Sequence, residues 1–262
     1  MSAKTRLYLV LWVAGFIGVS SILLIDLNAL IALLPVPAGG ESPRITPALK
    51  LLSLVQPAAL LALAVFAGMA LAPKVGLAAP AAEAWAASRP LWPALRSQLF
   101  PGLLGGLVGG ISIVLIAAIA TPLLPPGAAA KITAFGKLMP FPTRVLYGGI
   151  TEELLLRWGL MSLLVWGIWR GVQKQHPPAV SRCYHAAIFI SAAVFGAGHL
   201  PVAFLVVPEA TLALVAYVIL ANAAFGILAG YLYWKRGLEA AIVAHMITHV
   251  VLFTASRLGI YY

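Results

Sequence analysis

The sequence predicts an all-α fold, a polytopic bundle of about seven transmembrane helices, or eight if the first apolar run is interrupted. Of the 262 residues, 62% are hydrophobic and only 9% are charged, whereas soluble domains carry about 25% charged residues. The mean hydropathy is +1.01, and the apolar residues fall into runs long enough to cross a bilayer core of about 30 Å. Because the chain shows neither an internal repeat nor a low-complexity tail, residues 1–262 are expected to form a single integral membrane domain.

The first apolar run, roughly residues 7–34, follows a short basic start and so begins like a signal peptide. It is too long for a typical signal core and no clear cleavage site follows it. We therefore expect a retained helix, with a break near Asp26. The other predicted spans are residues 51–72, 99–124, 145–169, 184–207, 210–233 and 238–256.

Proline, glycine and charged residues separate the predicted spans. The connection AAPAAEAWAASRPLW could form a short amphipathic helix along the membrane interface. The distribution of Lys and Arg over the connections favours a cytoplasmic N-terminus. The net charge of +10 does not indicate a nucleic-acid partner, because the 17 basic residues are scattered between apolar runs. Cys183 is the only cysteine, which excludes an internal disulfide and a cysteine-based metal site.

Six ionisable residues lie deep within apolar runs, where charged groups are costly and usually functional. A rise of about 1.5 Å per helical residue places those of three helices about 8–18 Å from the same membrane face. Taken singly, each could be a structural ion pair or a polar contact between helices. Their arrival in one layer predicts a single buried site. The six residues are Glu152, Glu153, Arg157, His199, His245 and His249.

Spacing along the helix divides these residues further. Glu153 and Arg157 are four residues apart, so they share a helix face and can form an ion pair. Glu152 is turned about 100° from Glu153 in an α-helix and is free to point elsewhere. His245 and His249 are also four residues apart and face the same way. Small residues allow membrane helices to approach closely, and those beside the polar groups are Gly148, Gly149, Gly159, Gly196 and Gly198.

This set of residues suits hydrolysis by an activated water. A carboxylate beside an imidazole can deprotonate a water molecule, and further histidines could donate hydrogen bonds to an oxyanion that develops on a peptide carbonyl. The chain contains no GxSxG, no HExxH and no nucleotide-binding glycine motif. The apolar helix that carries His199 is expected to loosen just after it, at Pro201.

Three motifs resemble those of one family. Glu152-Glu153-Leu-Leu-Leu-Arg157 resembles the EExxxR motif of the CPBP family, which comprises membrane-embedded CAAX-type proteases and bacteriocin-processing relatives. Phe195-Gly-Ala-Gly-His199 is similar to the FxxxH of that family. His245-Met-Ile-Thr-His249 lies where the family has HxxxN or HxxxD. Order, spacing and helix placement agree over about residues 140–256, the expected motif-bearing protease core.

The resemblance implies an intramembrane endopeptidase of the glutamate type. Glu152 together with His199 would activate the water, and Glu153 with Arg157 would support the motif helix. His245 would help to form the oxyanion hole, together with the residue at position 249. The implied substrate is a membrane-anchored or hydrophobic peptide, and the implied location is a bacterial inner (plasma) membrane. No nucleic acid and no cofactor is expected.

His249 departs from the family pattern, which usually has Asn or Asp there. A neutral histidine can still donate a hydrogen bond, so the oxyanion role is retained as an expectation. Glu152, His199, His245 and His249 together would also make a plausible zinc set of nitrogen and oxygen ligands. We favour metal-free catalysis and keep a zinc-dependent protease as the alternative.

Two other classes of protein remain open. A proton- or metal-coupled transporter could use the same residues, but it would be expected to carry polar groups along a path from both faces, often with repeats. A catalytically inactive immunity or scaffold protein could be built on the same fold.

The charge bias places the polar layer nearer the outer face, whereas eukaryotic CAAX proteases cleave on the cytoplasmic side, so the orientation of the protein in the membrane also stays open.

Overall fold

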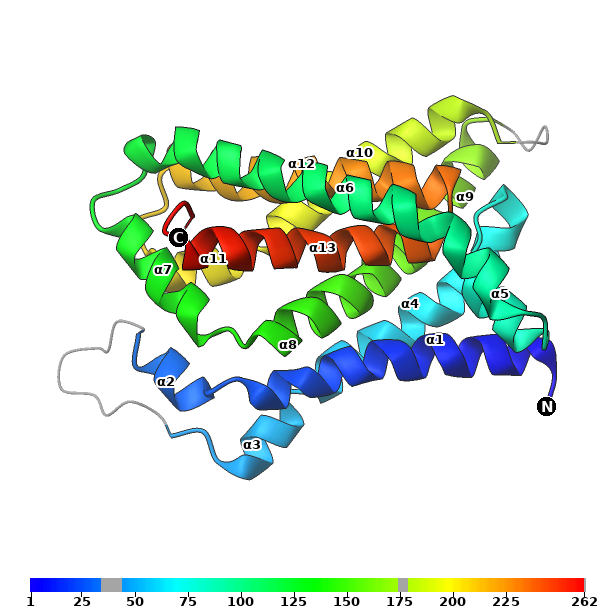
Figure 1. The fold of residues 1–262 in the computed structure, drawn as a ribbon, viewed down its shortest axis with the longest axis horizontal. Coiled ribbons are helices and arrows are strands. Elements are labelled where there is room, and N and C mark those ends of the chain that lie inside the picture. The colour runs from blue at the N-terminus through cyan, green and yellow to red at the C-terminus, as the bar shows by residue number, and fades with distance from the viewer. Residues whose placement is uncertain (34–43, 174–178, 262) are drawn as a thin grey trace.

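The computed structural model describes residues 1–33, 44–173 and 179–261, and the predicted end of the first apolar run, residue 34, lies outside them. The described ranges contain helices and no strand (Figure 1), which confirms the predicted all-α class. The α-helices are α1 (Ala3–Ser20), α2 (Leu27–Ile31), α3 (Pro47–Leu52), α4 (Val55–Leu71), α5 (Pro80–Ala86), α6 (Leu91–Ala120), α7 (Ala128–Leu138), α8 (Phe141–Thr143), α9 (Ser162–Gly171), α10 (Ser181–Gly198), α11 (Leu200–Val206), α12 (Leu212–Lys235) and α13 (Leu238–Arg257). Shorter or wider helical segments are η1 (Ser21–Leu24), η2 (Ala72–Val75), η3 (Thr121–Leu123), η4 (Arg144–Glu152) and η5 (Leu154–Met161).

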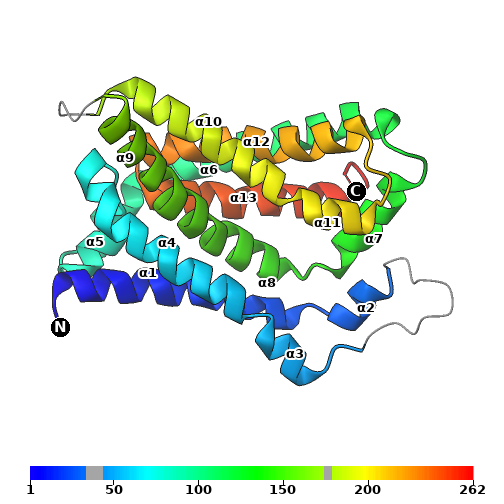
Figure 2. The same ribbon diagram turned by 180° about the vertical axis from the view of Figure 1, so that it is seen from behind.

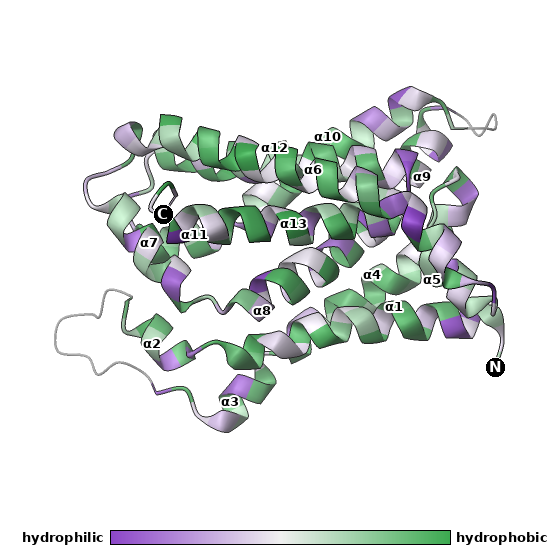
Figure 3. Ribbon diagram, in the orientation of Figure 1, coloured by the Kyte–Doolittle hydropathy of each residue, from purple (hydrophilic) through white to green (hydrophobic). Residues whose placement is uncertain are grey.

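The described part of the chain holds six helices that are long and apolar enough to cross a membrane. Hydrophobic residues run along most of their length, and the strongly hydrophilic ones gather mainly near helix ends (Figure 3). The predicted span 145–169 is not among the six, although the chain is helical without a break from Phe141 to Gly171. The six are Ala3–Leu24, Pro47–Val75, Leu91–Leu123, Ser181–Val206, Leu212–Lys235 and Leu238–Arg257.

The motif helix, residues 141–171, lies inside the bundle and packs against α1, α4, α10, α12 and α13 (Figures 1 and 2). Its central parts, η4 and η5, are π-helical. A π-helix bonds each residue to the fifth along the chain and occurs mostly as single turns, frequently at functional sites. The segment is therefore wider than the α-helix that the sequence predicts, while Glu152 and Glu153 still point in different directions, as expected.

Polar side chains of the motif helix attach it to the first two long helices. Thr151 donates from its hydroxyl to the carbonyl of Gly15 in α1 at 2.7 Å. Trp158, which is fully buried, donates from its indole nitrogen to the carbonyl of Val65 in α4 at 3.3 Å. Each bond satisfies a polar group that would otherwise be costly away from water. The N-terminal helices thus hold the motif helix against the rest of the bundle.

The first apolar run breaks where the sequence predicts. After η1, the side chain of Asp26 accepts hydrogen bonds from the backbone nitrogens of Asn28 and Ala29, at 3.1 and 3.0 Å. It thereby caps the start of the short helix α2. This end of the bundle carries α2, α3, α7 and α11, and the opposite end carries the N-terminus and α5 (Figure 1).

The short helix α5 fixes the start of α13 and so helps to position its histidines. The carboxylate of Glu239 in α13 accepts from the backbone nitrogens of Ala81 and Ala82, both at 2.9 Å. The Leu238 nitrogen donates to the carbonyl of Ala78 at 3.0 Å. The predicted amphipathic segment is thus a helix attached to the bundle, with Trp85 on its exposed side.

Helix α6 lies directly against α13, with glycines at the contact. A Cβ atom at Gly106 would lie 2.5 Å from the carbonyl oxygen of Ala244, which no real side chain tolerates. Thr248 of α13 donates from its hydroxyl to the Gly106 carbonyl at 3.1 Å. Small residues at such contacts let helices pack tightly in membranes, and here they bring α13 close to the centre of the bundle.

Candidate active site

A cavity of about 390 Å³ lies between α7, the motif helix, α10–α11, α12 and α13. Its wall is mainly apolar, and it reaches from the motif helix to the end of the bundle that carries α7 and α11. Of the six predicted site residues, Glu152, His199, His245 and His249 line this cavity, whereas Glu153 and Arg157 do not. The structure thus brings four residues from three helices to one space.

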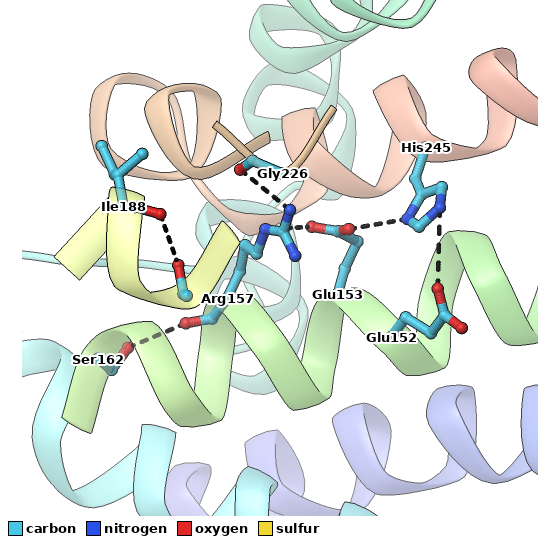
Figure 4. Close-up of polar contacts among 8 residues, drawn as sticks. Glu152, Glu153, Arg157, Ser162, Ile188, Gly226 and His245 are labelled. Atoms are coloured by element: carbon cyan, nitrogen blue, oxygen red, sulfur yellow. Dashed lines mark hydrogen bonds and ion pairs between the residues drawn. The ribbon is translucent and has the colours of Figure 1, made fainter. Parts of the chain in front are cut away.

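The two neighbouring acids of the motif helix occupy different environments (Figure 4). The side chain of Glu153 is fully buried, whereas that of Glu152 is 20% exposed and lines the cavity. The Glu152 Oε2 lies 3.9 Å from Nε2 of His245. This is too long for a direct hydrogen bond, and a separation of this size can be bridged by one water molecule.

Glu153 joins three helices. Its Oε2 lies 3.2 Å from Nε of Arg157, which confirms the predicted pair four residues apart. The Nη2 of Arg157 donates to the carbonyl of Gly226 in α12 at 3.1 Å. On the other side, Nδ1 of His245 lies 2.8 Å from Oε1 of Glu153. A carboxylate paired with Arg157 accepts this bond, which places the ring proton of His245 on Nδ1 and turns Nε2 toward Glu152.

Two phenylalanines of the cavity wall, Phe195 and Phe225, lie against the buried ion pair of Glu153 and Arg157. The guanidinium carbon of Arg157 lies 5.2 Å from the centre of the Phe195 ring, a cation–π distance. The Phe225 ring lies 4.3 Å from the ring of His245. The charged groups are thus enclosed by polarisable rings as well as by their hydrogen bonds.

His199 closes α10, as the sequence predicts, and α11 follows at once. Its Nδ1 lies 2.8 Å from the carbonyl oxygen of Phe195. Since a carbonyl can only accept, Nδ1 carries the proton and Nε2 is left as an acceptor. The ring is half-buried and stands edge-on to that of Phe195, with 4.8 Å between centres. His199 therefore offers the cavity a basic nitrogen.

His249 is held differently from the other two histidines. Its ring is stacked on His245, with 4.9 Å between centres and 13° between planes. Its Nε2 is buried, finds no hydrogen-bond partner in the described ranges, and rests against Gly148 of the motif helix. Any Cβ atom at position 148 would overlap that nitrogen. Gly148 therefore makes room for His249.

The flanking glycines were predicted to allow close approach, and most do. A Cβ atom would lie 2.5 Å from Met246 if added at Gly149, 2.6 Å from Ala64 if added at Gly159, and 2.8 Å from Ile219 if added at Gly196. Gly198 is the exception, because no described atom lies within 4 Å of a Cβ built there. For Gly198 the prediction was wrong, since the chain leaves the helix contact just before His199.

The four residues of the candidate zinc set are spread over the cavity wall. Among the described residues, no three His, Cys, Asp or Glu side chains come together as a metal site requires. The Nδ1 atoms of His199 and His245 are engaged by Phe195 and Glu153, which leaves the Nε2 atoms as the nitrogens that could bind a metal, whereas Nε2 of His249 faces Gly148. The four residues share a cavity without converging on one point.

Several polar residues of the cavity wall were missed by the sequence analysis, among them an amide and an arginine. Asn222 of α12 lies in the cavity wall, and the signal was available, since it is the only amide in the apolar run 210–233. Arg144 stands directly before the predicted span 145–169, and it lines the cavity as well. Its Nε donates to the carbonyl of Met139 at 3.1 Å and its Nη2 to that of Gly136, so it also closes the end of α7.

Comparison with known proteins gives a single finding. No curated protein and no solved structure gives a significant match to the chain. Residues 134–251 match the model of a family described as type II CAAX prenyl endopeptidase Rce1-like, and all six predicted site residues lie within that range. The match agrees with the resemblance of the three motifs, and it covers most of the residues that line the cavity. The match over residues 134–251 thus supports an assignment of this part of the chain to the Rce1-like family, the CAAX-type membrane peptidases.

Proposed function

We propose that the chain is an intramembrane endopeptidase in which Glu152, together with His199, activates the water that hydrolyses a peptide bond. One observation carries the proposal. Among the described residues, Glu152 is the only carboxylate in the cavity wall, and both His199 and His245 present an Nε2 acceptor to the same cavity. Glu153 is held by Arg157 and His245 and is fully buried.

The geometry supports a simple proton path. A water between Glu152 and His245 would donate one hydrogen to Oε2 and the other to Nε2, which are 3.9 Å apart. When this water attacks the carbonyl carbon, its proton passes to Glu152, with His199 as a second acceptor in the cavity. The carbonyl oxygen becomes an oxyanion, the C–N bond breaks, and the leaving amine takes the proton.

The histidines of α13 would support the oxyanion. His245 is oriented by Glu153 through Nδ1, so its Nε2 can only donate after it has taken up a proton. A proton shared between Glu152 and His245 would therefore stabilise the developing charge when it is needed. We assign His249 to the same wall, where its stacking on His245 holds that ring in place.

The proposed substrate is a membrane-anchored or hydrophobic peptide, and the family description directs attention to prenylated C-termini. The mainly apolar wall of the cavity suits such a ligand. We further propose a bacterial inner membrane as the location. Catalysis without a metal remains the mechanism that we propose.

The test uses the purified full-length protein in detergent and an internally quenched peptide that ends in a farnesylated CAAX sequence, beside its unprenylated counterpart. Glu152→Gln and His199→Ala should each lower kcat by about 10²–10⁴-fold, the range of general acid–base catalysis. Glu209→Gln is the matched control, because Glu209 is exposed and pairs with Lys131 outside the cavity. Wild-type cleavage by Glu152→Gln would refute the mechanism.

Metal content is measured on the same samples. We expect no stoichiometric zinc in the wild type and no loss of activity after treatment with a chelator. Stoichiometric zinc that disappears in His249→Ala would instead establish the zinc-dependent alternative.

A further inference from the structure

Three aromatic rings in the cavity wall mark one level of the bundle. The ring of His245 in α13 lies 4.3 Å from that of Phe225 in α12 and 5.9 Å from that of Phe195 in α10. Phe195 and Phe225 are themselves 6.5 Å apart. These three residues therefore give a common reference point along three helices.

One turn from this level, the same helices place polar side chains in the cavity. Helix α12 runs antiparallel to α10 and α13 (Figures 1 and 2). One helical turn, about 5 Å, separates the aromatic level from the next level toward the α7 end. In α10 and α13 this turn corresponds to four residues later in the sequence, and in α12, which runs the other way, to three residues earlier. The turn leads to His199, His249 and Asn222, and all three line the cavity.

Asn222 still has hydrogen-bonding groups to offer in this layer. Its Nδ2 donates one hydrogen to the carbonyl of Val218 at 2.8 Å. A primary amide has a second N–H and an acceptor oxygen, and the half-buried side chain lies in the cavity wall. The bond to Val218 fixes the orientation of the amide without using its full capacity.

The residue at position 249, where the family usually has Asn or Asp, gives a second reason to consider Asn222. The motif that begins at His245 resembles HxxxN or HxxxD, but this chain has His249, whose Nε2 is turned against Gly148. The amide that is absent from α13 is present on the neighbouring helix, at the same level of the cavity. A donor on α12 would face the motif helix from the side opposite to its attachment to α1 and α4.

We propose that Asn222 is a substrate-binding residue, whose free amide N–H donates to the carbonyl oxygen of the scissile peptide and to the oxyanion formed from it. This inference rests on the proposed function. A donor that contacts the oxygen in the transition state acts mainly on kcat, and removal of one such donor commonly costs about 10²–10³-fold. If the only role of the Asn222 amide were its hydrogen bond to the Val218 carbonyl within α12, replacing Asn222 would leave kcat unchanged.

The test compares Asn222→Ala, Asn222→Asp, His249→Asn and the double variant Asn222→Ala/His249→Asn on the farnesylated quenched peptide. We expect kcat to fall about 10²–10³-fold in Asn222→Ala with less than a threefold change in KM. Asn222→Asp, which keeps the shape but lacks the N–H, should fall similarly. An amide at position 249 should restore at least part of kcat in the double variant.

Asn28→Ala is the control, because Asn28 is the only other asparagine and lies in α2, away from the cavity. Thermal melting of each variant in detergent shows whether it is folded. A kcat within twofold of wild type in Asn222→Ala or Asn222→Asp overturns the inference, and so does a loss confined to KM. If Glu152→Gln abolishes cleavage while both Asn222 variants remain active, the inference fails and the proposed function stands.

Discussion

At the residue scale, the central feature is the division of labour between two neighbouring acids. The pairing of Glu153 with Arg157 could be predicted, since residues four apart on a helix meet, and the structure confirms it at 3.2 Å. The bond from Glu153 to His245 could not be predicted, because it joins residues 92 positions apart and depends on how two helices pack. Asn222 stood out in the sequence as the only amide of the apolar run 210–233, but its place in the cavity follows from the packing of α12.

The buried pair leads to a prediction about stability. Arg157→Met leaves the Glu153 carboxylate buried without its cation, and Glu153→Gln leaves the guanidinium unpaired. Breaking a buried ion pair from one side costs about 3–5 kcal/mol, so each single variant should melt well below wild type in detergent. The double variant Glu153→Gln/Arg157→Met should be more stable than either. Single and double losses that simply add would show that the pair is not coupled.

At the scale of elements, the sequence predicts the helices well and the geometry inside the motif helix poorly. Apolar runs and their flanks located most of the long helices to within a few residues, because length and hydropathy decide which segments can cross a membrane. The start of α6 was missed by eight residues, since α6 begins at Leu91 and the predicted span at residue 99, and the first long helix ends at Leu24, before the break that was expected near Asp26. The π-helical character of Arg144–Glu152 and Leu154–Met161 left no trace in that pattern. These segments make tertiary contacts that the pattern does not contain either, such as the Thr151 bond to Gly15 and the contact of Gly148 with His249.

The contact between the motif helix and α13 gives a prediction at this scale. Gly148→Ala places a Cβ where Nε2 of His249 lies, so it should displace the His249–His245 stack. Overpacking of this kind costs about 1–3 kcal/mol, and we expect lower melting temperature and lower kcat. The double variant Gly148→Ala/His249→Ala removes the overlap and should melt above Gly148→Ala. Gly198→Ala is the matched control, because no described atom lies within 4 Å of a Cβ there. Equal melting of Gly148→Ala and wild type would contradict the close contact.

At the scale of the whole molecule, the cavity reaches the end of the bundle that carries α7 and α11, opposite the N-terminus (Figure 1). The charge bias favours a cytoplasmic N-terminus, which places that end on the outer side of the membrane. Since the two ends carry different exposed lysines, Lys74 after α4 and Lys137 in α7, the orientation can be read from which of them faces outward.

The chain suits a cysteine-accessibility experiment, because its one cysteine, Cys183, is buried. In a Cys183→Ala background, Lys137→Cys should react with a membrane-impermeant maleimide in intact cells, and Lys74→Cys should react only after the membrane is opened. The reverse pattern would place the cavity mouth on the cytoplasmic side, where eukaryotic CAAX proteases cleave. The cavity that contains Glu152 is bordered by α7 and α11, so a peptide would enter it from that end of the bundle. The orientation of the protein therefore decides from which side of the membrane a substrate reaches Glu152.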